Sequence, residues 1–157
     1  MIYHPPPATR HPPPDTMRIL GIDYGTKRIG LAVGETDSGM SFPLRSVDNH
    51  GDLAAAAASV VAAAKEEDCV RFVIGMPTSL RGGESGETAV AVKKFAALLK
   101  QQSGLEVDTE DERLTTAMVE KMRKDAGIRP QDFDRDAAAA SVILESWLAR
   151  HRSTEAG

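Results

Sequence analysis

The chain has 157 residues, of which 41% are apolar, and its 19 basic residues stand against 23 acidic ones, a formal net charge of −4. This length and apolar content suit one domain around a single core and leave no comfortable room for two. The negative balance gives no whole-molecule attraction to a polyanion, so any nucleic-acid binding would have to rest on local basic patches.

The N-terminal segment 1–16 differs in composition from the rest of the chain. It holds six of the nine prolines and almost no apolar side chain that could reach a core. We therefore expect a disordered, polyproline-like tail on which function does not depend. Met17 opens the first apolar run and could itself be the translation start. The folded domain is expected at 17–150, followed by a short flexible tail at 151–157.

Three strands are predicted at the start of the domain. The run 18–23 is apolar on both faces, as expected for a central strand that is covered on each side. A turn at 24–27 separates it from a second apolar run at 28–34, and so short a turn requires an antiparallel hairpin. A third strand is predicted near 41–47.

Helices and further strands are predicted to alternate after this hairpin. Residues 52–66 are rich in alanine and favour a helix, which leads to a buried strand at 70–75. A glycine-rich loop then precedes a second helix at 88–102. Residues 105–110 alternate in the manner of a half-exposed strand near a sheet edge.

Two helices are predicted to close the domain. The first covers 115–126, with Thr115 as its N-cap and Gly127 as its stop, and the second covers 136–150. The element order predicts an α/β fold: a mixed five-stranded sheet, with three antiparallel strands and then parallel additions, and helices on both faces.

Asp23 is the first candidate site residue. It ends a strand that is otherwise apolar, at the carboxyl edge where α/β sheets usually hold ligands. Gly25 beside it would let a ligand or a metal ion approach the backbone closely. The alternative is a turn aspartate that forms a hydrogen bond within its own hairpin.

Asp136 is the second candidate, at the start of the last predicted helix. The helical period places it on the apolar stripe of Ile143 and Trp147, which faces the core. A first-turn acid that caps the helix is the alternative. However, Asp132 and Asp134 lie just upstream and could serve as caps, which would leave Asp136 for another role.

The pair Asp111 and Glu112 lies where the predicted edge strand runs into the next helix. At least one of the two could face the same sheet edge as Asp23, and strand parity favours Asp111. An exposed loop often carries such acids without any function, so the pair alone is a weak signal.

Together, these separated acids at element ends indicate a site for a hard divalent cation such as Mg²⁺ or Mn²⁺. Two Mg²⁺ ions about 3.5 to 4 Å apart can activate a water molecule and stabilise the leaving oxygen of a phosphodiester. Clustered carboxylates would otherwise repel one another and raise one another's pKa values.

Other kinds of active site fit the sequence poorly. Cys69 is the single cysteine, so the chain alone builds no disulfide and no cysteine-based zinc site, which favours a reducing, cytoplasmic setting. The histidines are too dispersed for Ser-His-Asp chemistry or a histidine-rich metal site. No apolar run approaches the roughly 20 residues that span a bilayer, so we expect no membrane partner.

Basic residues near the acids are candidates for holding a phosphate backbone. They lie in the hairpin turn, in the glycine-rich loop and in the segment 113–129, which carries five basic residues against two acidic ones. The candidates are Lys27, Arg28, Arg81, Arg113, Lys121, Arg123 and Lys124. For most of them a solvated helix face is an equally good interpretation.

Four segments occur in the order and spacing of a known family: ILGIDYGTKRIGLAV at 19–33, VIGMPTSLRGG at 73–83, DERLTT at 111–116 and DAAAASVILESWL at 136–148. Together they resemble the YqgF family, also called RuvX, over nearly all of residues 17–150. The resemblance implies a ribonuclease H-like fold related to the RuvC resolvases. It also implies one of two proposed activities, Holliday junction resolution or maturation of the 5′ end of the 16S ribosomal RNA precursor.

The resemblance also assigns the site residues. The family's acidic positions fall on Asp23, Glu112 and Asp136. The resemblance therefore favours Glu112 as the ligand, in place of Asp111, which strand parity favoured. These acidic positions imply a Mg²⁺- or Mn²⁺-dependent nuclease whose partner is either structured RNA, such as that of a ribosome precursor, or branched DNA. A junction resolvase would favour a homodimer, whereas RNA trimming could use a monomer. The chain departs from the family in its proline-rich tail and in Arg81, neither of which removes a ligand.

Two other functions compete with the nuclease. ATP-binding proteins of the actin-like superfamily also open with a Gly-Ile-Asp-x-Gly-Thr hairpin, but they need a second similar domain, for which this chain is too short. ATP binding with turnover would support that class. A non-catalytic nucleic-acid-binding or ribosome-assembly factor is the other alternative, and the presence of all three acids counts against it.

Overall fold

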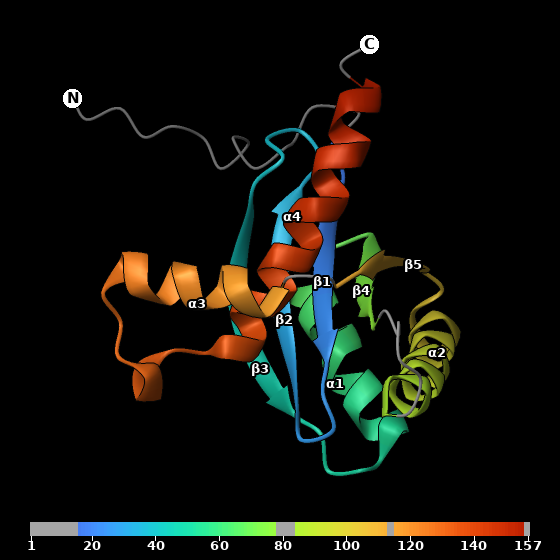
Figure 1. Ribbon diagram of the computed structural model, residues 1–157. Helices are drawn as coiled ribbons and strands as arrows, with labels where there is room; N and C mark the ends of the chain where they lie inside the picture. Colours follow the sequence, from blue (N-terminus) through green and yellow to red (C-terminus); the bar gives the residue numbers. More distant parts are fainter. Residues whose placement is uncertain (1–15, 78–83, 113–114, 156–157) are drawn as a thin grey trace, which may run out of the picture.

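The structure of the protein, a computed structural model, describes residues 16–77, 84–112 and 115–155 (Figure 1). Five strands form one sheet in the order β3-β2-β1-β4-β5. The strands are β1 (Arg18–Tyr24), β2 (Arg28–Glu35), β3 (Ser41–Asp48), β4 (Arg71–Met76) and β5 (Glu106–Asp111). The first three are antiparallel, and β4 and β5 add in parallel, so the predicted mixed sheet is confirmed.

Helices cover both faces of the sheet, as predicted. They are α1 (Leu53–Glu66), α2 (Glu84–Ser103), α3 (Thr115–Ala126) and α4 (Arg135–Glu155), with a 3₁₀ turn at Pro130–Asp132. Figure 1 shows α4 lying across β1 and β2, with α1 and α2 on the opposite face. Among the described residues, no helix is long and apolar enough to cross a membrane.

The two faces of β1 belong to different parts of the core. Leu20 and Ile22 pack with residues of α1 and α2, whereas Ile19 packs with residues of α4. Successive side chains of a strand point to opposite faces, so Gly21 and Asp23 share the face of Ile19. This double coverage accounts for the uninterrupted apolar run that predicted a central strand.

Glycines let α4 approach the sheet closely. A Cβ atom on Gly30 would lie 1.9 Å from the backbone oxygen of Asp136, and one on Gly21 would lie 2.7 Å from Cβ of Leu144. Neither position can hold a side chain without moving the helix. The first turn of α4, with Asp136, therefore rests directly on the backbone of β2.

The helix ends agree with most of the sequence predictions. Oδ1 of Asp134 accepts a hydrogen bond from the backbone N–H of Ala137 at 2.9 Å, so Asp134 caps α4 and leaves Asp136 free of that role. Gly127 has φ +68 just after α3, as its predicted stop requires. Thr115 was predicted as the N-cap of α3 but is its first helical residue, and its hydroxyl donates to the carbonyl of Glu112.

Two helices are longer than the sequence predicted. The second helix begins at Glu84 instead of residue 88, so that Gly86 lies within its first turn. The last helix continues to Glu155 instead of ending near residue 150, since the sequence offers no glycine or proline there to stop it. Neither difference moves a candidate acid.

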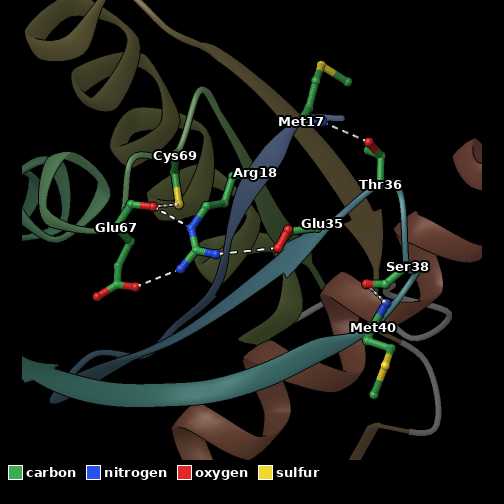
Figure 2. Close-up of polar contacts among 8 residues, drawn as sticks. All are labelled: Met17, Arg18, Glu35, Thr36, Ser38, Met40, Glu67 and Cys69. Atoms are coloured by element: carbon green, nitrogen blue, oxygen red, sulfur yellow. Dashed lines mark hydrogen bonds and ion pairs between the residues drawn. The ribbon is translucent and has the colours of Figure 1, made fainter. Parts of the chain in front are cut away.

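Arg18 ties together the amino end of β1 and two neighbouring segments (Figure 2). Its guanidinium donates to the carbonyl and to Oε1 of Glu67, the latter at 3.0 Å, and lies 3.6 Å from Oε1 of Glu35. The adjacent backbone N–H of Met17 donates to Oγ1 of Thr36 at 2.9 Å. The start of β1 is therefore joined to the end of β2 and to the residue after α1.

Candidate functional site

Three carboxylates from distant parts of the sequence line one cavity of about 320 Å³. Asp23 lies near the end of β1, Glu112 directly follows β5, and Asp136 lies in the first turn of α4. We call these three residues the carboxylate cluster. Both α3 and α4 complete the cavity wall, through Thr115, Thr116, Val119, Arg135 and Ala139.

The sheet topology explains why the cluster forms. Because β1, β4 and β5 are parallel, the carboxyl ends of β1 and β5 lie at the same edge of the sheet, with β4 between them. On the face toward α4, β4 carries Gly75 at this edge. A Cβ atom there would lie 3.0 Å from Oε2 of Glu112 and 2.5 Å from Cδ1 of Ile143. The missing side chain leaves room for Glu112 and α4 together.

The geometry of β5 also shows which acid of the Asp111–Glu112 pair faces the cluster. The side chains of Asp108 and Glu110 both turn toward α4, where they bond to Trp147 and Ser146 respectively. Continuing this alternation places Glu112, not Asp111, on the α4 face. Asp111 is exposed and lines a different cavity, between α3 and α4. Strand parity favoured Asp111 as the acid that faces the same edge as Asp23, and this is wrong, because Glu112 lines the cavity with Asp23.

Two acids of the carboxylate cluster, Asp23 and Glu112, have raised pKa values. Burial, and then the neighbouring charges of Glu112 and Asp136, together raise the pKa of Asp23 from its ordinary value of 3.8 to about 7. Burial, and then the charge of Asp111, also raise the pKa of Glu112. Asp23 is thus an acid held among like charges in a partly buried position.

The cluster offers the donor type that a hard cation requires. Carboxylate oxygens are the preferred ligands of Mg²⁺ and Mn²⁺, and a cation would offset the repulsion that adds to burial in raising the pKa of Asp23. Within the described ranges, no group of three or more acidic, histidine or cysteine side chains is already arranged to hold a metal ion. Cation binding would thus require these side chains to turn toward one another.

Two predicted phosphate-binding residues lie in the hairpin between β1 and β2. Nε of Arg28 is 3.1 Å from Oδ2 of Asp136, so this arginine reaches the carboxylate cluster. Lys27 is exposed in the turn just before it. The hairpin therefore brings positive charge to the same end of the sheet as the acids.

The other predicted basic residues have different surroundings. Lys121 and Lys124 are exposed on α3, and Lys121 pairs with Asp125 at 2.8 Å. Arg123 is only 14% exposed, pairs with Glu120, and donates to the carbonyl of Ile128 at 2.7 Å. It thus closes the carboxyl end of α3. Arg81 and Arg113 lie outside the described residues.

Arg135 is a cavity residue that the sequence analysis missed. It lines the cavity beside Asp136 and pairs with Glu120 of α3 at 2.8 Å. Hydrogen bonds from Arg123 and Arg135 lower the pKa of Glu120 to about 2. A cation in the first turn of a helix is opposed by the helix dipole. The unfavourable position of a basic residue in the first turn of α4 is the sequence signal that could have identified Arg135 as a site residue.

Curated proteins similar to this chain share most of its length. A protein of Maridesulfovibrio salexigens is 37% identical over 136 residues, which is 85% of this chain and 99% of that protein. One of Chloroflexus aurantiacus is 35% identical over 137 residues, 86% of this chain and 88% of its own length. Both are described as "Putative pre-16S rRNA nuclease".

Solved structures confirm the predicted ribonuclease H-like fold. Thermus thermophilus RuvC in complex with a Holliday junction substrate superposes with a TM-score of 0.61 at 14% identity, covering 88% of this chain and 98% of that one. Fowlpox virus resolvase, solved with its substrate Holliday junction DNA, gives a TM-score of 0.55 at 12% identity, with 85% and 98% coverage. Such low identities establish the fold alone.

The family assignment rests on the sequence. A family model described as "RuvX: Holliday junction resolvase" matches residues 17–150. This range contains every member of the carboxylate cluster and all five strands. With relatives above 30% identity over most of its length, the chain belongs to the RuvX family.

Proposed function

We propose that this protein is a divalent-metal-dependent nuclease that hydrolyses phosphodiester bonds in structured nucleic acid. The observation that carries the proposal is the convergence of Asp23, Glu112 and Asp136 on one cavity from β1, β5 and α4. A buried charge is costly unless it is paired, and Asp23 is held among acids. Such an arrangement is useful where a cation is the missing partner.

The carboxylate cluster would hold Mg²⁺ or Mn²⁺, with one or two ions in the cavity. When bound, these ions supply Lewis acidity that activates water and stabilises the leaving oxygen of the phosphodiester. Asp23, Glu112 and Asp136, which line the same cavity, are the candidate ligands.

Side chains around the cavity would position the nucleic acid. Lys27 and Arg28 of the hairpin are the candidates for holding a phosphate next to the reacting bond. Lys121 and Lys124, exposed on α3, would extend the contact along the backbone of the substrate. Arg81 and Arg113 remain predicted contributors. Arg123 is left out, since it closes the end of α3.

The favoured substrate is precursor 16S ribosomal RNA. The relatives of highest identity reported above carry that substrate in their descriptions and match the chain over 85% and 86% of its length. A Holliday junction is the second candidate, supported by the description of the family model. The fold shared with RuvC does not decide between the two, because phosphodiester hydrolysis in a ribonuclease H-like fold can serve either polymer.

A direct test is cleavage of matched substrates by the purified protein. A precursor 16S RNA fragment and a four-way DNA junction would each be incubated with Mg²⁺, Mn²⁺ or EDTA. We expect cation-dependent cleavage, faster on the RNA, and its loss in Asp23→Asn while the variant stays folded. Cleavage that survives EDTA or the substitution would refute the metal site. ATP hydrolysis in place of nucleic-acid cleavage would instead support an actin-like function.

A further inference from the structure

Arg28 is positioned by the same geometry that positions Asp136. Gly30 and Ala32 of β2 face α4, and Arg28 lies two residues before Gly30 on the same face. The first turn of α4 rests on Gly30, so the guanidinium of Arg28 meets the carboxylate of Asp136 at 3.1 Å. The side chain of Arg28 thus reaches Asp136 from β2, while Asp136 itself belongs to α4.

The ion pair between Arg28 and Asp136 is weakly held. The side chain of Arg28 is 63% exposed and that of Asp136 is 28% exposed. The described residues give this guanidinium no second partner, whereas Arg123 is secured by both Glu120 and the carbonyl of Ile128. Exposed ion pairs contribute little to stability, so Arg28 can leave Asp136 at small cost.

We propose that Arg28 exchanges partners during substrate binding. It pairs with Asp136 while the carboxylate cluster has no cation, and it binds a phosphate of the nucleic acid once a cation has taken Asp136. This inference rests on the proposed function and goes beyond it, because it makes metal occupancy the condition for one phosphate contact.

The charges of the site favour such an exchange. Without a cation, a phosphate that approaches the cavity meets three acids, while Arg28 is engaged with Asp136 and Arg135, which lines the cavity, with Glu120. With a cation in place, the same phosphate meets the cation and a released guanidinium. Each ligand then strengthens binding of the other, and this coupling must be reciprocal.

The test compares Arg28→Gln with a matched control, Arg45→Gln. Arg45 is an exposed arginine of β3 that pairs with Glu66 at 3.4 Å and does not line the cavity. Calorimetry would measure Ca²⁺ and Mn²⁺ affinity without nucleic acid. Fluorescence anisotropy would measure binding of a labelled RNA hairpin with and without Ca²⁺, with the probe checked for integrity on a gel.

Removal of the competing guanidinium should raise cation affinity about threefold in Arg28→Gln. We expect Ca²⁺ to tighten hairpin binding about tenfold in the wild type and in Arg45→Gln, but less than about threefold in Arg28→Gln. A long-range charge effect alone would change both affinities and leave the coupling between them intact. The coupling is therefore the decisive quantity.

The salt dependence of hairpin binding gives an independent readout. One lost phosphate contact lowers the slope of log affinity against log salt by about one. The exchange predicts this loss in Arg28→Gln only when Ca²⁺ is present. A lower slope without Ca²⁺ as well would mean that Arg28 always holds phosphate, and the exchange would be refuted.

The outcomes separate this inference from the proposed function. If the wild type binds neither Ca²⁺ nor Mn²⁺, both fail. If it binds them and Arg28→Gln keeps the full coupling, only the exchange fails. Thermal unfolding would verify that Arg28→Gln is folded, and Arg28→Lys, which keeps the charge without the planar guanidinium, should retain part of the coupling.

Discussion

The two ends of β1 differ in the charged residues that surround them. At the amino end, Arg18 lies between Glu35 and Glu67, and each contact joins a different segment of the chain (Figure 2). At the carboxyl end, Asp23 lies with two other acids, and burial and their charges raise its pKa to about 7. At one end an arginine is paired with both neighbouring acids, whereas the other end gathers three acids in one cavity, where Arg28 pairs with Asp136.

This contrast separates stability from function along a single strand. Paired charges at the amino end hold neighbouring elements together, whereas the gathered acids lower the free energy of unfolding until something neutralises them. Binding sites often carry such local instability, because the ligand supplies the missing interaction. Three substitutions test whether the two ends differ in this way.

The largest expected effect is on catalysis at the carboxyl end. Glu112→Gln should reduce the cation-dependent cleavage rate at least about a hundredfold, because it removes a charged ligand from the cavity. The control is Asp111→Asn, the adjacent acid, which lines a different cavity. Its rate should stay within about threefold of the wild type. Equal losses in the two variants, measured at saturating Mg²⁺, would contradict the assignment of Glu112.

The next effect concerns stability and pH at Asp23. The folded, metal-free protein keeps a proton on Asp23 between its ordinary pKa of 3.8 and about 7, whereas the unfolded chain releases it. The unfolding free energy should therefore fall as pH rises through that window. Above pH 7, Asp23→Asn should be more stable than the wild type by up to about 4 kcal/mol.

Chemical denaturation at pH 4 and pH 8 without metal would measure this difference. The gain from Asp23→Asn should be small at pH 4, where the wild type is protonated in the folded state. Saturating Mg²⁺ at pH 8 should stabilise the wild type and leave the variant nearly unchanged. A variant that is less stable than the wild type at pH 8 would show that Asp23 contributes to the fold as an ordinary turn residue.

The smallest effect is expected at the amino end. Arg18→Gln should destabilise the fold by about 1 kcal/mol, since Arg18 is partly exposed but bonds to both Glu67 and Glu35. Its cleavage rate should match that of the wild type under conditions where both proteins are folded. A loss of activity without a loss of stability would break the proposed division between the two ends.

Much of the fold could be predicted from the sequence because the signals were local. The apolar run of β1, the short hairpin turn and the capping role of Asp134 each depend on a few neighbouring residues. The choice between Asp111 and Glu112 was different. It depended on which face of β5 turns to α4, and that face carries the acids Asp108 and Glu110, paired with residues of the helix.

The basic residues show the same limit of local reasoning. Arg123 belongs to a basic segment, yet its hydrogen bond to the carbonyl of Ile128 assigns it to the end of α3. Arg135 lines the cavity, and its ion pair with Glu120 links it to α3. A basic residue in a sequence therefore does not show which acid or carbonyl it will bind, whether that partner is local, as for Arg123, or on another helix, as for Arg135.

The contact between Gly30 and Asp136 limits how this site can vary. Two main chains meet there without an intervening side chain, and a Cβ atom on Gly30 would lie 1.9 Å from the oxygen of Asp136. The distance between helix and strand is thus already at its minimum. Redesign of the cavity for a smaller cation would have to exchange its side chains, since α4 has no closer position to adopt.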